Sequence, residues 1–381
     1  MSRTGPAGPL GAGVVVQQLF APVPGGIGRY VRALVRHLPA VAAADRGEVR
    51  WIAASVPRRR LAAAGLDPAA TLRQRLPGRL ATRAWVELRR PRLPRRVVAG
   101  LDVVHATSAA VPPARRLPLV ATVHDLAFHH QPETFPASGR RFHERATRIV
   151  AAEAALVLVP SAATARDLVD GYGLERGRVR VVPLGADPAP DPLDLAPARK
   201  LLADLGVPGP FLLAVGTVEP RKNLQRLLEA FGACASALPE HRLVVAGPAG
   251  WGPRLRPTGA AERVAFAGAV SQAQLHGLYR LADGLAYPSL YEGFGLPVLE
   301  AMAHGTPVLT SDRSSLPEVA GDAALLVDPL DADAITAGLV RLVGDRALRE
   351  RLARAGPRRA ARFTWPATAQ ATWAAYREAA R

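Results

Sequence analysis

The stretch Tyr287–Pro307, YPSLYEGFGLPVLEAMAHGTP, predicts a ligand-binding loop between a strand and a helix. The apolar run Leu285–Tyr287 is strand-like, and Leu296–Ala303 has the spacing of a helix. Ligands of open α/β sheets bind beyond the carboxyl ends of the strands, where this loop would lie. The loop and helix carry Glu292 and Glu300, and a carboxylate accepts hydrogen bonds from two neighbouring hydroxyls at once. The stretch therefore suits a ribose or a hexose.

The turn before this helix also offers backbone donors. The N–H groups of Phe294, Gly295 and Leu296 precede the first helical hydrogen bonds, so we expect them to bind sugar hydroxyls or phosphate oxygens. A simpler interpretation stays open, in which Glu292 is favoured by the helix dipole and Glu300 is a solvated helix residue.

A second motif, Gly216–Leu224, reads GTVEPRKNL and lies between the apolar run FLLAV and a helical pattern. Arg221 and Lys222, which we expect at the start of that helix, bring two cations to its N-terminus, an arrangement that suits a diphosphate. As solvated cations they would oppose the helix dipole by about 0.3–1 kcal/mol each unless an anion were present. Lys222 and Lys200 are the two lysines of this arginine-rich chain, and a lysine supplies a compact point charge.

The first half of the chain carries two further candidates. His124 and Asp125 end an apolar run in TVHDL, where an imidazole can bind a sugar hydroxyl or a phosphate and the acid can fix its orientation. Gly25 and Gly26 belong to PGGIGRY, which lacks the third glycine of a dinucleotide-binding fingerprint. A purely structural histidine and a simple tight turn are the alternatives.

These motifs resemble those of a known enzyme family. The text EGFGLPVLEAMAHGTPVLTSD, which continues to SSLPEVAGDAALLVDP, closely resembles the nucleotide-sugar-binding half of retaining glycosyltransferases of the family 4 type, which have the GT-B architecture. GTVEPRKNL is similar to the diphosphate-binding motif of this family, and HDL matches its strand-end motif. Together, SLYEGFGLP and HDL are most similar to bacterial mannosyltransferases that use GDP-mannose.

The resemblance implies a role for each candidate residue. Glu300 would bind the ribose of the nucleotide, and Glu292 would hold the hydroxyls of the donor sugar. His124 would contact the donor sugar or the acceptor. The implied catalytic residues are Glu292, His124, Arg221 and Lys222. The implied donor-binding residues are Gly25, Gly26, Gly216, Arg221, Lys222, Phe294, Gly295, Leu296 and Glu300.

The implied activity is that of a retaining hexosyltransferase that moves a hexose, with mannose preferred, from a nucleoside diphosphate sugar to an acceptor hydroxyl. The acceptor would belong to glycan, glycolipid or cell-surface polysaccharide synthesis. Because Arg221 and Lys222 can neutralise a diphosphate, we expect neither a metal nor another cofactor, and helix capping explains Asp331 and Asp333. Two alternatives stay open: a sugar-nucleotide epimerase of the same architecture, and a basic nucleic-acid-binding protein.

The whole chain predicts an α/β fold of two domains. Short β-branched runs alternate with amphipathic helical runs, which favours parallel sheets covered on both faces, and 381 residues exceed one ordinary core. The run ADPAPDPLDLAP after Gly185 is typical of a linker. With the resemblance, this predicts the GT-B architecture: two Rossmann-like doubly wound domains facing a cleft. We expect an acceptor-side domain over residues 1–186, a nucleotide-sugar-binding domain over 187–363, and a C-terminal helix over 364–381 that crosses back onto the first domain.

The predicted strands alternate with helices that begin near Ile27, Arg141 and Ala163 in the first half. The strands are Val14–Phe20, Arg50–Ser55, Asp102–Ala106, Leu119–His124, Leu156–Pro160, Val179–Pro183, Phe211–Val215, Leu243–Ala246, Val264–Phe266, Gly284–Tyr287, Val308–Thr310 and Leu325–Val327.

Composition bears on partners and location. The net charge is +17, but aromatic residues make up only 5%, which argues against a nucleic-acid surface of basic and stacking side chains. Arginines cluster with leucines and a tryptophan between Arg73 and Arg96, and such a segment either lies on an anionic bilayer or forms a solvated face. The single cysteine, Cys234, excludes a disulfide framework. We expect a cytoplasmic protein, peripheral on the inner face of the plasma membrane if that segment binds lipid.

Overall fold

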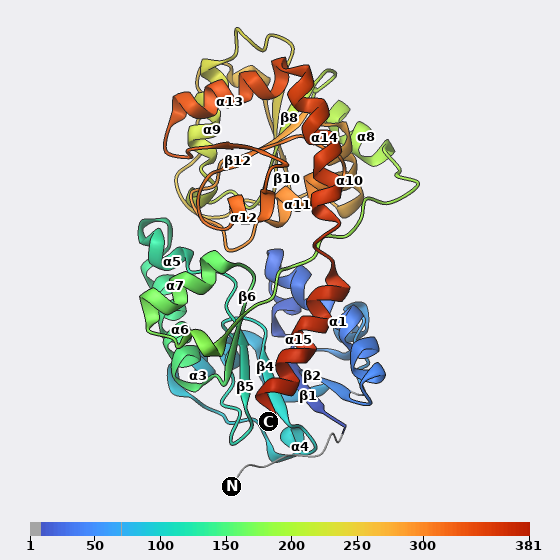
Figure 1. The fold of residues 1–381 in the computed structure, drawn as a ribbon, viewed down its shortest axis with the longest axis vertical. Coiled ribbons are helices and arrows are strands. Elements are labelled where there is room, and N and C mark those ends of the chain that lie inside the picture. The colour runs from blue at the N-terminus through green and yellow to red at the C-terminus, as the bar shows by residue number, and fades with distance from the viewer. Residues whose placement is uncertain (1–8, 70) are drawn as a thin grey trace. The chain divides into compact units, whose positions relative to one another are not determined.

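A computed structural model of the protein, shown in Figure 1, describes residues 9–69 and 71–381. The chain divides into two compact units, each built on its own parallel sheet. The first comprises the chain up to Gly185 together with Trp365–Arg381, and the second comprises Ala186–Thr364. Among the described residues, no helix is long and apolar enough to cross a membrane. The predicted α/β fold of two Rossmann-like units is confirmed.

The first unit has a seven-stranded parallel sheet in the order β3-β2-β1-β4-β5-β6-β7. The four central strands β1, β4, β5 and β6 are buried along their whole length, as expected for a parallel sheet covered on both faces. The strands are β1 (Gly11–Val15), β2 (Glu48–Ser55), β3 (Leu72–Pro77), β4 (Val103–Ala106), β5 (Leu119–Thr122), β6 (Leu156–Val159) and β7 (Val179–Val181). The α-helices are α1 (Gly25–Ala44), α2 (Arg58–Ala63), α3 (Gly78–Leu88), α4 (Arg95–Val98), α5 (Ala127–His130), α6 (Ala137–Glu153), α7 (Ala162–Tyr172) and α15 (Trp365–Ala379).

The second unit has a six-stranded parallel sheet in the order β10-β9-β8-β11-β12-β13. The chain builds one half outward from β8 and the other half outward from β11, so the strand order reverses between these two neighbours. The strands are β8 (Phe211–Val215), β9 (Arg242–Ala246), β10 (Val264–Gly268), β11 (Gly284–Tyr287), β12 (Val308–Ser311) and β13 (Leu325–Val327). The helices are α8 (Ala196–Asp204), the 3-10 turn η4 (Pro220–Lys222), α9 (Leu224–Ala233), α10 (Gln272–Leu281), α11 (Leu296–Ala303), α12 (Leu316–Ala320), α13 (Ala332–Gly344) and α14 (Arg346–Ala360).

Apolar runs located most of the strands correctly. Three predictions match the observed bounds: Phe211–Val215, Gly284–Tyr287 and Leu325–Val327. The predicted strand Val14–Phe20 is partly wrong, because β1 ends at Val15 and the 3-10 turn η1 covers Gln17–Phe20. Val16 leaves the extended region at ψ 19°, and the Gln17 side chain then accepts a hydrogen bond from the Ala54 N–H at 3.0 Å.

The C-terminal helix α15 is part of the first unit, as the resemblance implied. It packs against α1, and its Tyr376 is fully buried. The Tyr376 hydroxyl lies 2.6 Å from Nδ1 of His105, whose Nε2 lies 2.7 Å from the hydroxyl of Thr122. Burial lowers the pKa of His105 to about 3, so this ring is neutral at physiological pH and links α15 to β4 and β5 through hydrogen bonds alone.

The basic segment between Arg73 and Arg96 is not a single amphipathic helix. It runs through β3, which the sequence did not predict, and then through α3 and α4. Strand β3 pairs with β2 at the edge of the sheet. Its three consecutive polar residues, Arg73, Gln74 and Arg75, do not form the apolar run that marks the other strands. The tryptophan of the segment, Trp85, is fully buried in the core, whereas Leu80 and Leu88 are 59% and 69% exposed on the same helix.

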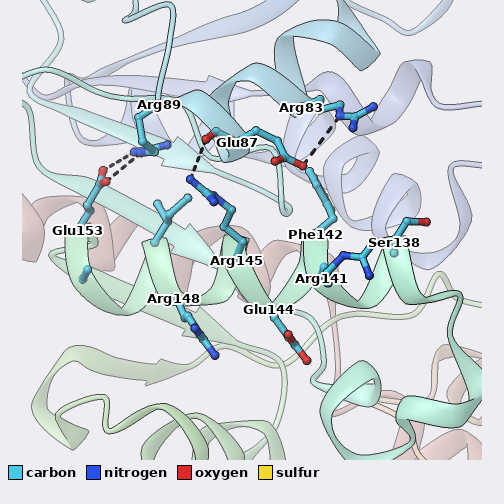
Figure 2. Close-up of a pocket in the computed structure, with 13 residues that line it drawn as sticks. Arg83, Glu87, Arg89, Ser138, Arg141, Phe142, Glu144, Arg145, Arg148 and Glu153 are labelled. Carbon is cyan, nitrogen blue, oxygen red and sulfur yellow. Dashed lines mark hydrogen bonds and ion pairs between the residues drawn. The ribbon is translucent and has the colours of Figure 1, made fainter.

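Helices α3 and α6 line an open groove of about 980 Å³, which we call the arginine groove (Figure 2). Arg141, Arg145 and Arg148 line it from α6 and follow one another at the spacing of a single helix face. Arg145 donates to two backbone carbonyls of α3, at 2.7 and 2.8 Å. Arg83 lines the groove from α3. The basic surface therefore extends onto a helix outside the predicted segment.

Candidate functional site

The candidate site lies where the strand order of the second unit reverses, between β8 and β11. Both strands are parallel, so the segments that follow them leave the sheet at the same edge. After β8 the chain forms η4, which carries Arg221 and Lys222, and after β11 it forms the loop that carries Glu292. Ligands of doubly wound sheets bind at such a reversal.

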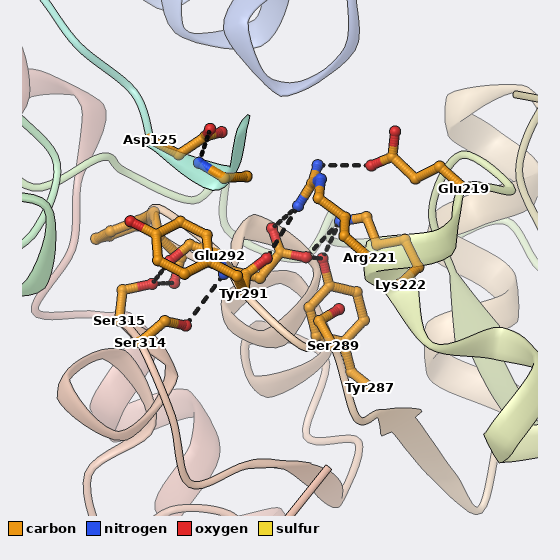
Figure 3. A network of polar contacts seen from close by, with 12 residues as sticks. Asp125, Glu219, Arg221, Lys222, Tyr287, Ser289, Tyr291, Glu292, Ser314 and Ser315 are labelled. Atoms are coloured by element: carbon orange, nitrogen blue, oxygen red, sulfur yellow. Dashed lines mark hydrogen bonds and ion pairs between the residues drawn. The ribbon is translucent and has the colours of Figure 1, made fainter. Parts of the chain in front are cut away.

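A compact ion cluster joins these two segments (Figure 3). The Glu292 carboxylate receives Lys222 Nζ on Oε1 at 2.6 Å and Arg221 Nη1 on Oε2 at 2.8 Å. Arg221 Nη2 also contacts Oε1 of Glu219 at 2.7 Å. The four side chains are between 4% and 17% exposed, so the charges are largely removed from water. Two cations and two carboxylates balance one another within the protein.

Tyr287, at the end of β11, completes the cluster from below (Figure 3). Lys222 Nζ donates to its hydroxyl at 2.5 Å, and that hydroxyl donates to Glu292 Oε1 at 2.9 Å. Burial, together with the charge of Glu292, raises the pKa of Tyr287 well above its ordinary value. The phenol therefore stays protonated and acts as a fixed bridge between the lysine and the carboxylate.

The cluster keeps Glu292 ionised. Burial by itself would raise the pKa of this carboxyl, but the charges of Arg221 and Lys222 outweigh burial and lower the pKa to about 2. Burial and the neighbouring Arg221 lower the pKa of Lys222, while Glu292 acts in the opposite direction. Because the ionised carboxylate lies 2.6 Å from Nζ, the lysine is best described as charged at neutral pH.

Two serines after β12 hold the loop in place. The Glu292 N–H donates to Oγ of Ser314 at 3.0 Å. The Ser315 hydroxyl lies 2.8 Å from the carbonyl oxygen of Glu292 and 3.0 Å from that of Phe294. Backbone atoms on both sides of the carboxylate are therefore anchored to the same neighbouring segment, which fixes its position.

The predicted cation motif is present, but its local structure differs from the expectation. Lys222 does not open a helix: it ends the turn η4, Asn223 adopts the left-handed conformation at φ 59°, and α9 begins one residue later. The Asn223 amide donates to the carbonyls of Pro288 and Pro329 at 3.0 and 2.7 Å, which ties the turn to the β11 loop and to the segment after β13. Gly216, at φ 145°, leaves room for the Lys222 side chain, whose Cε would lie 3.3 Å from an added Cβ.

The second carboxylate, Glu300, lies on α11 outside the ion cluster. Its Oε2 accepts a hydrogen bond from the Tyr279 hydroxyl at 2.9 Å. The helix begins at Leu296, and Gly295 at φ 107° forms its N-cap. Among residues 9–69 and 71–381, the N–H groups of Phe294, Gly295 and Leu296 have no hydrogen-bond partner.

The first-unit candidates have local roles that the sequence did not predict. His124 Nε2 lies 2.9 Å from the carbonyl oxygen of Thr107, so it carries the proton and donates there. Burial lowers the pKa of His124. Asp125 does not orient this ring through a hydrogen bond: its Oδ1 accepts from the Ala127 N–H at 3.0 Å and starts the short helix α5.

The glycine motif of the first unit is helical. Gly25 and Gly26 are the first two residues of α1, not a loop that precedes a helix at Ile27. Both are exposed, and Gly25 has a φ of 59° that other residues adopt at a cost. Pro24 caps this helix, which explains why the sequence pattern resembled a turn.

The described part of the chain holds no group of three or more histidine, cysteine, aspartate or glutamate side chains that could bind a metal ion. Asp331 caps α13, because its Oδ1 accepts from the N–H groups of Asp333 and Ala334 at 2.9 and 3.0 Å. Capping accounts for its carboxylate, as the sequence indicated.

The sequence did not predict the contacts of several site residues. Tyr287 and Tyr279 fit the apolar patterns of a strand and a helix, and Ser314 and Ser315 lie in an ordinary polar turn. Glu219 was visible within GTVEPRKNL, but nothing in that text shows that it would bind Arg221.

Because of this cluster, we predict that the free energy of unfolding depends on pH. The pKa of Glu292 is lowered from an ordinary value of 4.5 to about 2, so its contribution to stability is fully present above pH 4.5 and is lost as pH falls through 2. We expect Glu292→Gln, which leaves two buried cations without this partner, to reduce the free energy of unfolding at pH 7 by about 3–5 kcal/mol. The difference from the parent should shrink between pH 4.5 and 2 in urea unfolding.

Glu350→Gln is the matched control for this prediction. Glu350 pairs with Arg346 on an exposed helix surface, so its loss should leave unfolding at pH 7 unchanged. A Glu292→Gln protein as stable as its parent at pH 7 would show that the buried carboxylate is not ionised.

Comparison with known proteins points to one enzyme family. Residues 24–190 match the family model described as Glycosyltransferase Family 4, and residues 204–359 match the model described as Glycosyl transferases group 1. The chain is 34% identical over 272 residues to O-antigen chain mannosyltransferase B of Escherichia coli, covering 68% of this chain and 70% of that protein. It is 31% identical over 318 residues to the MMP alpha-(1->4)-mannosyltransferase of Mycolicibacterium hassiacum, covering 74% and 73% of the two chains. A D-inositol 3-phosphate glycosyltransferase of Nocardia farcinica is 36% identical, but the match spans 61% of its length.

Solved structures show the same fold at low sequence identity. Sucrose-phosphate synthase from Thermosynechococcus elongatus superimposes with a TM-score of 0.69 at 22% identity, over 97% of this chain and 98% of that one. Anabaena HepE, in a complex with UDP and glucose, superimposes with a TM-score of 0.71 at 19% identity, over 97% of this chain and 100% of the other. Two parallel-sheet units, both family models and relatives above 30% identity lead to one conclusion: the chain belongs to the family 4 and group 1 glycosyltransferases of GT-B architecture.

Proposed function

We propose that this glycosyltransferase moves a hexose from a nucleoside diphosphate sugar to an acceptor hydroxyl with retention of anomeric configuration. The ion cluster at the strand-order reversal carries the proposal. Arg221 and Lys222 are buried cations at the proposed ligand-binding edge of the sheet, and both pair with Glu292. The unpartnered N–H groups at the start of α11 follow Glu292 in the same loop. A diphosphate is a ligand that suits both.

The cluster suggests how the diphosphate would be stabilised as it leaves. When the bond between the sugar C1 and the phosphate oxygen breaks, negative charge grows on that oxygen. Arg221 and Lys222, already fixed by Glu292 and Tyr287, would stabilise this charge without rearranging at the moment of reaction. Glu292 would keep acceptor capacity for the hydroxyls of the donor sugar.

Retention is proposed without a covalent intermediate. The acceptor oxygen would attack C1 on the face from which the diphosphate departs, forming the new C1–O bond as the old one breaks. The acceptor proton would pass to the leaving phosphate oxygen. Glu292, the carboxylate of the cluster, is held by Lys222, Arg221 and Tyr287, which favours a positioning role over that of a nucleophile.

Mannose is the proposed sugar and GDP-mannose the proposed donor. Two relatives at 34% and 31% identity are named mannosyltransferases, and the chain spans 70% and 73% of their lengths. The proposed acceptor is a hydroxyl of a glycan or of a lipid-linked glycan. An epimerase would convert the donor without an acceptor, so product analysis with and without acceptor separates the two functions.

The function is tested by donor binding and transfer in matched variants. We expect Lys222→Ala and Glu292→Ala each to reduce turnover at least 10²-fold, the size typical of one lost charge-stabilising contact. Thermal-shift assays with GDP, UDP and their hexose conjugates would identify the donor, because ligand binding raises the unfolding temperature with concentration. Transfer would then be measured with that donor, and the anomeric configuration of the product read by NMR.

The other lysine of the chain supplies the control. Lys200 is exposed and pairs with Asp204 on α8, so Lys200→Ala should retain the parent's turnover. Near-normal turnover in a folded Lys222→Ala protein would contradict the proposed function.

Metal independence is proposed on the same grounds. Arg221, Lys222 and the N–H groups at the start of α11 would supply hydrogen-bond donors to the diphosphate, so a divalent ion is not needed to hold it. We expect transfer to continue after exhaustive treatment with EDTA, measured as initial rate. Loss of activity that returns only with magnesium or manganese would overturn this proposal.

The arginine groove supports a proposal for location. Arg141, Arg145 and Arg148 form one basic stripe on α6, and Leu80 and Leu88 are exposed on the neighbouring helix α3. Cations flanked by exposed leucines are typical of surfaces that lie on anionic bilayers. We therefore propose that this face of the first unit contacts anionic lipid at the inner face of the plasma membrane.

Vesicle sedimentation tests the membrane proposal. The parent should bind vesicles that contain phosphatidylglycerol and should lose binding in high salt or on phosphatidylcholine alone. Arg141→Glu with Arg148→Glu should weaken binding at least tenfold, since each surface charge contributes about 1 kcal/mol. The same charge reversal at Arg354 and Arg358, on α14 of the second unit, is the control. Equal loss in both double variants would contradict a specific docking face.

A further inference from the structure

The carboxylate of Glu300 is held by a residue of a neighbouring helix. Tyr279 lies in the last turn of α10 and is 1% exposed. Its hydroxyl donates to Glu300 Oε2 at 2.9 Å. A hydrogen bond to an ionised group is stronger than one between neutral groups, so this contact restrains the rotation of the carboxylate.

Tyr279 is itself fixed on its main-chain side. The Thr306 hydroxyl donates to the Tyr279 carbonyl oxygen at 2.6 Å, which links α10 to the segment between α11 and β12. The phenol ring lies 5.5 Å from the imidazole of His304. These contacts restrict the movement of Tyr279, so its hydroxyl is a fixed hydrogen-bond donor for the Glu300 carboxylate.

A histidine pair fixes the backbone of Glu300 as well. His304 Nδ1 lies 2.8 Å from the Glu300 carbonyl oxygen and therefore donates to it. The Nε2 of His304 must then accept, so the proton between it and His276 Nδ1, 3.0 Å away, belongs to His276. Burial, with the nearby His276 and Arg280, lowers the pKa of His304 to about 4, so this neutral arrangement holds at physiological pH.

We propose that Tyr279 is a positioning residue for the nucleotide ribose. The inference rests on the proposed function, in which Glu300 binds that ribose. A carboxylate has about four acceptor sites, and the Tyr279 hydroxyl occupies one of them on Oε2. By holding the carboxylate plane, it aligns the remaining sites before the vicinal 2′- and 3′-hydroxyls arrive. Tyr279 thus sets how well the site distinguishes a ribonucleotide from a nucleotide without those hydroxyls.

This role has a specific thermodynamic signature. Restraining Glu300 in advance removes an ordering cost that would otherwise reduce affinity. Only ligands that bind the carboxylate gain affinity in this way. Tyr279→Phe should therefore weaken binding of a ribonucleotide and leave binding of a dideoxynucleotide unchanged. A residue that merely supported the packing of α10 against α11 would weaken both ligands equally.

Isothermal titration with GDP, UDP and their 2′,3′-dideoxy forms tests the inference. We expect Tyr279→Phe to weaken binding of the ribonucleoside diphosphate roughly 5- to 10-fold, within the range for the cost of immobilising one side chain on binding. Binding of the dideoxy form should stay within about twofold of the parent. In steady-state transfer, KM for the donor should rise while kcat changes little.

Companion variants make each result decisive. Glu300→Gln should likewise weaken binding of the ribonucleotide and spare the dideoxynucleotide. The double variant should bind the ribonucleotide as tightly as Glu300→Gln alone, because the two residues act as one unit. Tyr172→Phe, in the first unit, removes a phenol hydroxyl outside the second unit and should match the parent.

Three outcomes would overturn the inference. If Glu300→Gln weakens the ribonucleotide selectively but Tyr279→Phe does not, Tyr279 has no positioning role and the proposed function stands. If Tyr279→Phe weakens ribo and dideoxy forms alike, its role is packing. If Glu300→Gln itself leaves ribonucleotide binding unchanged, the ribose assignment of the proposed function fails and this inference fails with it.

Discussion

The ionised carboxylate of Glu292 holds together the two segments that follow β8 and β11 in the second unit. It lies between two cations that come from a segment 70 residues earlier in the chain. Moving four charges out of water costs several kcal/mol per ion, and mutual attraction offsets that cost only if the geometry is well defined. Tyr287, Ser314 and Ser315 provide that definition.

A buried ion cluster is therefore weak evidence for stability and stronger evidence for function. Apolar side chains of the same volume would hold β8 and β11 together with less desolvation. What they would not provide is a pair of cations held at the sheet edge in the absence of a ligand. Preorganised charge of this kind is the main way in which enzymes stabilise charge that develops during a reaction.

The sequence predicted the elements of the fold better than the contacts of the site. Buried parallel strands are continuous apolar runs, so β8, β11 and β13 could be placed to the residue. The edge strand β3 was missed because three consecutive polar residues, Arg73, Gln74 and Arg75, interrupt its apolar run. Arg221, Lys222 and Glu292 were each identified from local motifs. Their mutual pairing could not be predicted, because sequence motifs alone gave no evidence that they would meet, and the cations were expected to await an external anion. Tyr279 and Tyr287 were missed because a phenol fits an apolar pattern and its hydroxyl leaves no periodic signal.

The place of α15 in the first unit has a consequence for biosynthesis. This helix is encoded after the whole of Ala186–Thr364, yet its Tyr376 hydroxyl completes a buried chain of hydrogen bonds with His105 and Thr122. Domains generally fold in order as the ribosome releases them. Here the second unit can finish folding while the first still exposes the surface that α15 will cover. During translation the first unit cannot complete its core until α15 has been made, which happens only after the second unit. A nascent chain paused before residue 365 therefore exposes the surface that α15 will cover, where chaperones can bind.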